Sequence, residues 1–270
     1  MKVWKNTKTL DGLIDDLDIT NNKSNAGVLL LGGKSISLNE FPNVKGIFRA
    51  GVGDNNVPYD EAKRRNVAVS LPSDDAKDYI YEETSNFTCH LILKSMYRSS
   101  NIGTISPWKK KSRVFLGDRT LLVIGKGRIG QKVYEKMHPF MRVDSYDILE
   151  NSLKELHAKI ESADCITLHI PLNDDTKDFI DKEKLSWMKE GCCLINTSRG
   201  DIVNELDITK SIRSGKITAT FDVFWDEPYL GPLTKYPESF IMTPHVASTC
   251  DKFLIQTAKD FRDFMKKVLK

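Results

Sequence analysis

Residues 121–130 have the sequence LLVIGKGRIG, in which four apolar residues run directly into three glycines with the spacing GxGxxG. The apolar run predicts a buried strand, and a helical pattern follows the last glycine. Gly125 permits a tight turn, Gly127 lets the backbone approach a pyrophosphate, and Gly130 lets helix and strand pack closely. The start of the helix offers free N–H groups and a positive dipole end to phosphates. This order indicates a dinucleotide site, although an ordinary glycine-rich turn remains the alternative.

An acidic residue, Asp147, closes the next expected strand, 17 residues after Gly130. A carboxylate at this place accepts hydrogen bonds from the adenine ribose hydroxyls and repels a 2′-phosphate. We therefore expect NAD rather than NADP as the cofactor. Arg128 could help to bind a 2′-phosphate, which leaves this choice open.

Short apolar runs alternate with amphipathic stretches along most of the chain, a pattern that predicts an α/β fold with parallel sheets. In the second part of the chain the expected strands are residues 121–124, 143–146, 165–170, 192–196, 218–223 and 239–242. Six strands with helices between them, beginning at a glycine-rich turn, predict a doubly wound dinucleotide-binding domain.

The first part of the chain predicts a smaller βα domain over residues 1–82. Its expected elements are strands at residues 27–31, 46–48 and 67–70 and a helix at residues 59–66. A long helical pattern over residues 82–98 is expected to connect it to a second domain at residues 83–249. The amphipathic helix expected at residues 250–270 could return to the first domain.

Composition excludes several classes of function. The 270 residues carry 40 basic and 37 acidic side chains without a long block of one sign, so nothing indicates nucleic acid or an anionic membrane as partner. No apolar run approaches the roughly 20 residues of a membrane span, and the N-terminus lacks a secretion signal. The five cysteines have no metal-type spacing, so we expect no metal site and a reduced, cytoplasmic setting.

Three polar segments follow expected strands at their carboxyl ends: NTSRG at residues 196–200, DVFWDEP at residues 222–228 and TPHV at residues 243–246. In open α/β sheets the ligand crevice lies outside this edge. Arg199, Glu227 and His245 can therefore converge although they are far apart in sequence.

These three residue types suit the reduction of a 2-oxo acid. An imidazole can deliver a proton to the carbonyl oxygen, so His245 is the expected acid/base. A carboxylate holds the ring, which gives Glu227 the role of partner. The planar fork of Arg199 can bind a substrate carboxylate. Asp222 is expected nearer the nicotinamide. Each residue alone has an ordinary structural explanation: a structural histidine, a surface salt bridge or a solvated loop residue.

The chain resembles the D-isomer-specific 2-hydroxyacid dehydrogenases. The resemblance rests on GKGRIG at residues 125–130, LHIPL at residues 168–172 with Thr176, INTSRGD at residues 195–201, and on residues 222–228 and 243–245. It implies a doubly wound Rossmann NAD-binding domain plus a smaller flavodoxin-like α/β substrate domain, and a homodimer. It also implies that Arg199, Glu227 and His245 form the catalytic set.

The resemblance further assigns binding residues. Those expected to bind NAD are Gly125, Gly127, Arg128, Ile129, Gly130, Asp147, Ile170, Pro171, Thr197, Ser198 and Asp222. Val52 and Gly53, in the first domain, are expected to bind the substrate carboxylate through backbone amides, with Arg199 as the other substrate contact; a mere tight turn is the alternative. The chain departs from the family's pattern in a short first domain and in Lys126 between the first two glycines.

The expected function is that of an NAD-dependent oxidoreductase that interconverts a small 2-oxo acid and a D-2-hydroxy acid, such as hydroxypyruvate, glyoxylate or a phosphorylated relative. The alternative is an NAD(H)-binding regulator of the corepressor type. A third possibility is a family member that binds the nucleotide but has lost turnover.

Overall fold

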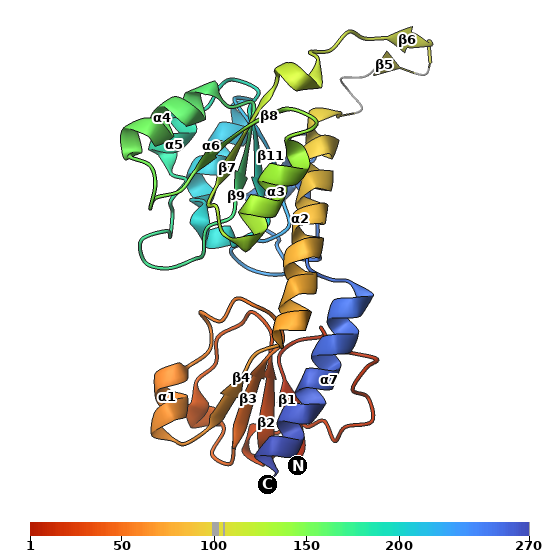
Figure 1. Cartoon of the computed structure of the whole chain (residues 1–270), viewed down its shortest axis with the longest axis vertical. Helices are drawn as coiled ribbons and strands as arrows, with labels where there is room; N and C mark the ends of the chain where they lie inside the picture. Colours follow the sequence, from red (N-terminus) through yellow and green to blue (C-terminus); the bar gives the residue numbers. More distant parts are fainter. Residues whose placement is uncertain (99–102, 105, 270) are drawn as a thin grey trace. The chain divides into compact units, whose positions relative to one another are not determined.

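The computed structural model describes residues 1–98, 103–104 and 106–269 (Figure 1). It divides into two compact units, one made of Met1–Tyr81 with Ser248–Lys270 and the other of Glu82–Ala247. The expected domains were residues 1–82 with 250–270 and residues 83–249. Each unit has its own sheet and its own buried core.

The described part of the first unit contains a four-stranded parallel sheet in the order β1-β2-β3-β4. Its strands are β1 (Lys2–Lys5), β2 (Ala26–Leu31), β3 (Gly46–Arg49) and β4 (Ala68–Ser70). The sequence predicted the last three but not β1. This short strand pairs with β2 and buries Val3 completely, so its structure depends on tertiary pairing more than on its own sequence.

Helices cover both faces of this sheet. Val28 and Leu30 share a core with Phe261 and other residues of α7 (Asp251–Val268), whereas Leu29 and Leu31 share one with Ala62 of α1 (Tyr59–Arg64). This alternation is the period of two that a strand imposes on its side chains. The C-terminal helix therefore packs on the sheet formed by the start of the chain.

The described part of the second unit contains a six-stranded parallel sheet in the order β12-β11-β10-β9-β7-β8. Its strands are β7 (Thr120–Ile124), β8 (Arg142–Tyr146), β9 (Cys165–Leu168), β10 (Cys193–Asn196), β11 (Thr218–Phe221) and β12 (Phe240–Met242). The strand order reverses at β7, which lies between β8 and β9. Such a switch point, at the carboxyl ends of the strands, is where ligands bind in this class of fold.

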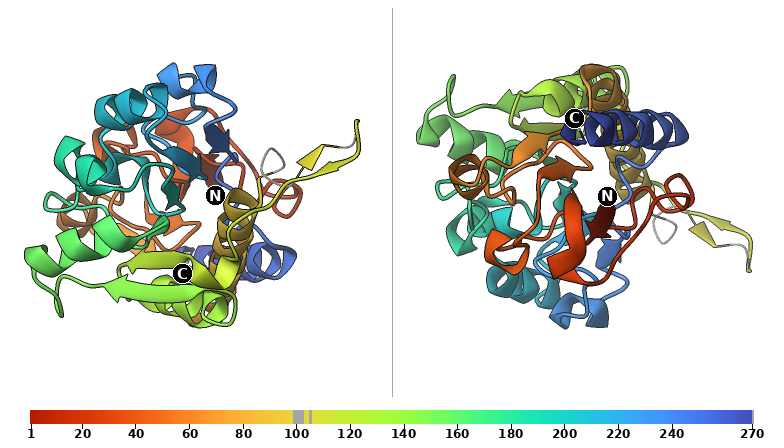
Figure 2. Two further views of the ribbon diagram at one scale, coloured as in Figure 1. Left: turned by 90° about the horizontal axis from the view of Figure 1, so that it is seen from above. Right: turned by 90° about the horizontal axis from the view of Figure 1, so that it is seen from below.

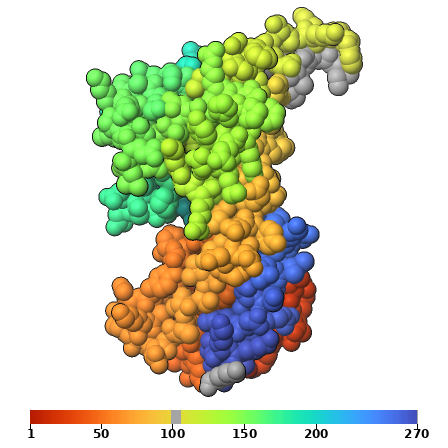
Figure 3. All heavy atoms as spheres, viewed as in Figure 1, coloured from red at the N-terminus to blue at the C-terminus, as the bar shows by residue number. Residues whose placement is uncertain are grey.

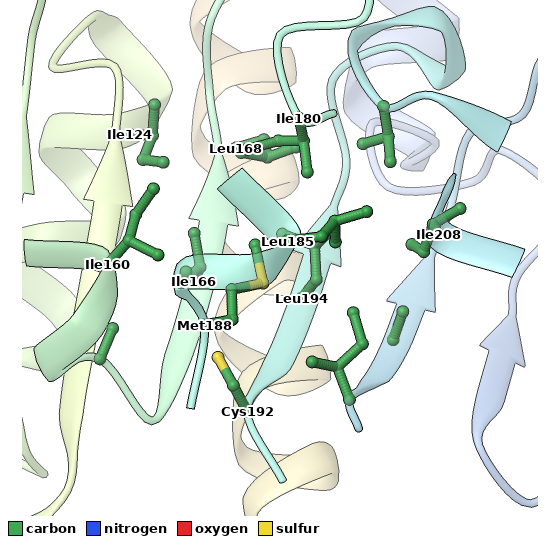
Figure 4. Packing of buried hydrophobic residues seen from close by; sticks show 14 of the residues in the cluster. Ile124, Ile160, Ile166, Leu168, Ile180, Leu185, Met188, Cys192, Leu194 and Ile208 are labelled. Atoms are coloured by element: carbon green, nitrogen blue, oxygen red, sulfur yellow. The ribbon is translucent and has the colours of Figure 1, made fainter. Parts of the chain in front are cut away.

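Helices also cover both faces of the larger sheet (Figures 1 and 2). α2 (Asp74–Met96) and α3 (Arg128–Met137) pack on one face, and α4 (Leu153–Ser162), α5 (Lys182–Trp187) and α6 (Glu205–Arg213) pack on the other. Figure 4 shows the hydrophobic core between the sheet and the helices α4, α5 and α6, which is built mainly from aliphatic side chains. α2 begins eight residues before the helix expected at residues 82–98.

Local signals set several helix starts. At the start of α4, Ser152 Oγ accepts a hydrogen bond from the Glu155 N–H, and Glu155 Oε2 accepts one from the Ser152 N–H at 2.7 Å. This capping box satisfies two N–H groups and is worth about 1 kcal/mol.

The described residues also contain short 3-10 helices: η1 (Lys23–Asn25), η2 (Leu38–Glu40), η4 (Leu116–Asp118), η5 (Gly200–Ile202) and η6 (Pro232–Lys235).

A hairpin that the sequence did not predict follows α2. It pairs β5 (Gly103–Thr104) with β6 (Lys109–Lys110) in antiparallel fashion. Figure 3 shows the described part of this hairpin, in yellow, extending away from the rest of the second unit. Within the described residues, no helix combines the length and the apolar character needed to cross a membrane.

Candidate active site

The glycine turn joins β7 to α3. Gly125 has a φ of +96°, which favours glycine, and a methyl group there would lie 2.7 Å from the carbonyl oxygen of His169. A methyl group at Gly130 would lie 1.9 Å from the carbonyl oxygen of Gly125. At Gly127, by contrast, a methyl group would meet no atom of the described residues within 4 Å. The turn is closed at two glycines and open at the third, which fits a pyrophosphate lying against the backbone of Gly127.

Asp147 lies beside this turn, after the end of β8. Its Oδ2 accepts a hydrogen bond from the Lys126 N–H at 2.9 Å, and its Oδ1 accepts one from the Leu149 N–H at 3.1 Å. Lys126 Nζ forms an ion pair with Glu150 at 2.8 Å, and this hydrogen bond raises the pKa of Lys126. The Asp147 carboxylate is thereby fixed next to the glycine turn. A carboxylate oxygen can accept more than one hydrogen bond, and the contact of Asp147 with ribose hydroxyls remains a prediction.

The other residues expected to contact NAD lie at the same edge of the sheet. Arg128 and Ile129 begin α3, and Ile170 and Pro171 follow β9. The Ile170 side chain comes within 2.9 Å of the position that a methyl group on Gly125 would take. Ile170 therefore borders the turn directly.

Thr197 and Ser198 follow β10 and are both tied to their surroundings. Thr197 Oγ1 lies 2.9 Å from Oγ1 of Thr88 on α2, and Ser198 Oγ donates to the carbonyl oxygen of Leu168 at 2.7 Å. These contacts fix the start of the segment that carries the expected substrate arginine. Whether the two residues contact NAD remains a prediction.

Arg199 is half-buried between β10 and η5. Its Nη1 donates to the Ser198 carbonyl oxygen at 2.7 Å, and no other hydrogen bond or ion pair of its guanidinium is found within the described part of the chain. Burial lowers the pKa of Arg199, and the charge of Glu227 acts in the opposite direction. The guanidinium carries a charge, because arginine side chains are not deprotonated in proteins. Its remaining N–H groups can bind a carboxylate.

Glu227 and His245, 18 residues apart, form a direct pair. His245 Nδ1 lies 3.0 Å from Oε1 and 2.9 Å from Oε2 of Glu227, and the Phe224 N–H donates to Oε1 at 3.2 Å. Burial alone would raise the pKa of Glu227, but the hydrogen bond and charge of His245 outweigh it, with help from the Phe224 N–H and Arg199, so that the pKa is lowered. Glu227 is therefore a carboxylate at neutral pH. It occupies Nδ1 and leaves Nε2 for a ligand.

The backbone of His245 has an unusual conformation, with a φ of +53°. A non-glycine residue in this region costs about 1–3 kcal/mol and persists only where its surroundings impose it. Asp222, which is fully buried, holds the segment: Oδ1 accepts from Thr243 Oγ1 at 2.5 Å and from the Val246 N–H at 3.0 Å, and Oδ2 accepts from the Ala247 N–H at 2.8 Å. Burial raises the pKa of Asp222 although these hydrogen bonds lower it.

Asp222 thus positions the turn that carries His245. The sequence assigned it to NAD, and that contact remains a prediction. Sequence reasoning missed Thr243 as its partner, and also Asn196, whose Nδ2 donates to the Arg199 carbonyl oxygen at 2.8 Å and whose Oδ1 accepts from the Ser198 N–H. The sequence signal that could have identified Asn196 is its position as a polar residue at the end of an apolar strand.

In the first unit, Val52 and Gly53 lie in a braced loop. Arg49, which is buried, donates from Nε to the Gly53 carbonyl oxygen at 2.9 Å. Asn56, also buried, donates from Nδ2 to the carbonyl oxygens of Gly32 at 2.9 Å and Lys34 at 3.0 Å. The loop is therefore held from both ends.

Comparison with known proteins places these features in context. Residues 92–247 match the family model described as D-isomer specific 2-hydroxyacid dehydrogenase, NAD binding domain. The D-specific alpha-keto acid dehydrogenase of Enterococcus faecium is 30% identical over 253 residues, which cover 84% of this chain and 74% of that protein. The D-3-phosphoglycerate dehydrogenase of Bacillus subtilis is 31% identical over 238 residues, which cover 82% of this chain and 44% of that protein. The matched part of the chain thus spans less than half the length of the latter relative.

The chain is also similar over its full length to a solved structure. The D-lactate dehydrogenase from Aquifex aeolicus, complexed with NAD and lactic acid, has a TM-score of 0.78 at 25% sequence identity, with coverage of 100% of this chain and 96% of that chain.

Proposed function

The chain belongs to the D-isomer specific 2-hydroxyacid dehydrogenases, and from this membership we propose that it interconverts a small 2-oxo acid and a D-2-hydroxy acid with NAD. The membership confirms the expected family, the α/β fold class with a Rossmann domain, and NAD as the cofactor. The observation that supports the reaction most directly is the contact between His245 Nδ1 and the Glu227 carboxylate, at 2.9 Å.

Each residue of the set has a role that its surroundings allow. Bound NAD would supply or accept the hydride at C2 of the substrate. His245 would transfer the proton to or from the substrate oxygen through Nε2, while Glu227 holds Nδ1 and stabilises the charged ring. Arg199 would bind the substrate carboxylate with the N–H groups that Ser198 does not occupy.

We also propose that the first unit contributes to substrate binding. The backbone amides of Val52 and Gly53 would bind the substrate carboxylate, supported by the loop that Arg49 and Asn56 brace. The substrate would be a short acid such as hydroxypyruvate, glyoxylate or a phosphorylated relative.

The test is a turnover assay with matched variants. Purified protein with NADH and a panel of 2-oxo acids should lose absorbance at the NADH band, and His245→Ala should abolish the loss while NADH binding, followed by fluorescence, persists. His157→Ala is the control, because His157 also faces a glutamate, Glu161 at 3.4 Å, but lies on α4, where its ring packs against Trp187 of α5. Equal activity of both variants would contradict the role of His245.

The same assay addresses the other functions considered. The regulatory function of the corepressor type is not favoured, since the curated relatives are named as dehydrogenases and reductases. NADH binding without turnover of any acid by the unaltered protein would contradict our proposal and would fit a regulator or an inactive family member.

The homodimer and the cytoplasmic location expected from the sequence also remain proposals. Trp108 and Phe115, which are 81% and 74% exposed, are apolar side chains that a second copy would cover. Sedimentation of the purified chain tests the dimer: a mass of one chain at micromolar concentration would contradict it.

A further inference from the structure

A polar cavity of about 790 Å³ lies in the second unit, away from the residues described above. Its wall includes Asp164, Cys193 and Thr218, which lie at the amino-terminal ends of β9, β10 and β11. The glycine turn, Arg199 and the segment that carries His245 follow the carboxyl ends of the strands. The cavity and the candidate active site therefore lie at opposite edges of one sheet.

The cavity concentrates positive charge. Its wall carries four cationic side chains, Arg98, Lys111, Arg113 and Arg119, and one acidic side chain, Asp164. Their formal sum of +3 equals the net charge of the whole chain.

The single carboxylate is already neutralised. Asp164 accepts hydrogen bonds from the Thr120 N–H at 2.8 Å and from Arg119 Nη1 at 2.9 Å, and Lys189 Nζ lies 3.5 Å away. Burial alone would raise the pKa of Asp164, but these partners lower it. Asp164 is thus an ionised partner of Arg119 and does not offset the charges of Arg98 and Arg113.

Arg98 supplies the feature that points to a ligand. Its Nη1 donates to the Glu238 carbonyl oxygen at 2.9 Å, while Nε and Nη2 are buried and have no hydrogen-bond partner among the described residues. Buried donors are normally paired, because an unpaired one has lost its water without replacement. The C-terminal end of α2, at Met96, favours a cation nearby but does not satisfy these two groups.

The geometry of the guanidinium defines the chemistry of the ligand. Nε and Nη2 form the side of the group that donates two parallel hydrogen bonds to two oxygens of one anion. Arg113 stands over the ring of Tyr97 at 5.2 Å, which holds a second guanidinium at the wall. A doubly charged, tetrahedral oxyanion matches several cations better than a monovalent carboxylate.

We propose that this cavity is a binding site for a phosphate group, either inorganic phosphate or the phosphate of a small ester, with Arg98 as its principal ligand. The site is separate from that for NAD and does not depend on the proposed reaction.

Isothermal titration with inorganic phosphate at constant ionic strength tests this site. The titration is made in the presence of saturating NADH, so that phosphate cannot bind at the glycine turn. The unaltered protein should show saturable binding. Arg98→Gln should weaken it at least tenfold, and Arg98→Lys, which keeps the charge but loses the fork, should weaken it less. Arg213→Gln, at an exposed arginine in the last turn of α6, is the control and should change nothing.

Three outcomes would overturn the proposal. Phosphate binding that disappears with NADH would belong to the glycine turn. Binding that is equal in the unaltered protein and Arg98→Gln would exclude Arg98. A change in sedimentation of Arg98→Gln without a change in phosphate affinity would make the cavity a contact between subunits. Arg113→Gln, at an exposed residue, keeps the test decisive if Arg98→Gln does not fold, and should weaken binding at least threefold.

Discussion

Alanine substitutions at two glycines of the same turn should damage different properties of the protein. At Gly130 an added methyl group would lie 1.9 Å from the carbonyl oxygen of Gly125, which is a backbone atom in a closed turn. At Gly127 the methyl group would enter space that is open among the described residues. Gly130→Ala should therefore damage the fold, and Gly127→Ala should damage NADH binding alone.

The distances give the size of each effect. Carbon and carbonyl oxygen normally approach no closer than about 3.3 Å, so Gly130→Ala must move backbone by more than ~1 Å. Overpacking of this kind costs about 1–3 kcal/mol, and the melting temperature should fall by roughly 2–12 °C. Gly127 caps α3, so Gly127→Ala should cost less than about 1 kcal/mol. Its methyl group should weaken NADH binding about 5- to 150-fold, which corresponds to about 1–3 kcal/mol.

Two measurements on each variant decide the matter: thermal unfolding without ligand, and titration with NADH followed by fluorescence. The reasoning is refuted if Gly127→Ala binds NADH as tightly as the unaltered protein, because the open space would then not be where the pyrophosphate lies. It is also refuted if Gly130→Ala melts at the unaltered temperature.

Three further predictions concern single residues. Arg199→Lys keeps the charge but loses the planar guanidinium, so kcat/KM should fall about 10²-fold, as when one hydrogen-bond donor is removed from an active site. NADH affinity should stay constant, and near-native kinetics would contradict the role of Arg199. Because the pKa of Glu227 is lowered in the folded protein, its carboxylate stabilises the fold at neutral pH, and this contribution is lost as the pH falls through the lowered pKa. Glu227→Gln should therefore lose less stability on acidification than the unaltered protein, as measured by urea unfolding. Asp147→Ala should weaken NADH binding more than NADPH binding; equal losses in the two fluorescence titrations would remove Asp147 from cofactor selection.

The sequence predicted most of the larger sheet because its strands are buried on both faces and form continuous apolar runs. The strands expected at residues 121–124 and 192–196 are examples: the first lies inside β7, and the second begins one residue before β10. β1 was missed because KVWK has no such run and owes its structure to β2. The start of α2 was missed because the expected helix began at residue 82, at the expected domain boundary, whereas the helix begins at Asp74 in the first unit and continues into the second.

The sequence allowed the residues of the candidate site to be selected, but not the contacts that hold them in place. Strand ends and residue chemistry were enough to select Arg199, Glu227 and His245. The contacts that hold them join residues far apart in the chain, such as Asp222 with the Ala247 N–H, or lie in backbone conformations, such as the positive φ of His245. Neither leaves a pattern in one sequence, since many residues at position 222 would suit the end of a strand equally well.

The two edges of the larger sheet should recognise anions by different means. At the carboxyl edge, helices such as α3 begin, and their free N–H groups and positive dipole ends can hold a phosphate where Gly127 leaves room, without a cationic side chain. At the amino-terminal edge, helices such as α2 end, and their carbonyl groups oppose an anion. An anion site there must rely on side-chain charge, which is what Arg98 and its neighbours supply. Salt should therefore weaken phosphate binding in the cavity more steeply than it weakens NADH binding at the turn, and equal salt dependence would argue against this division.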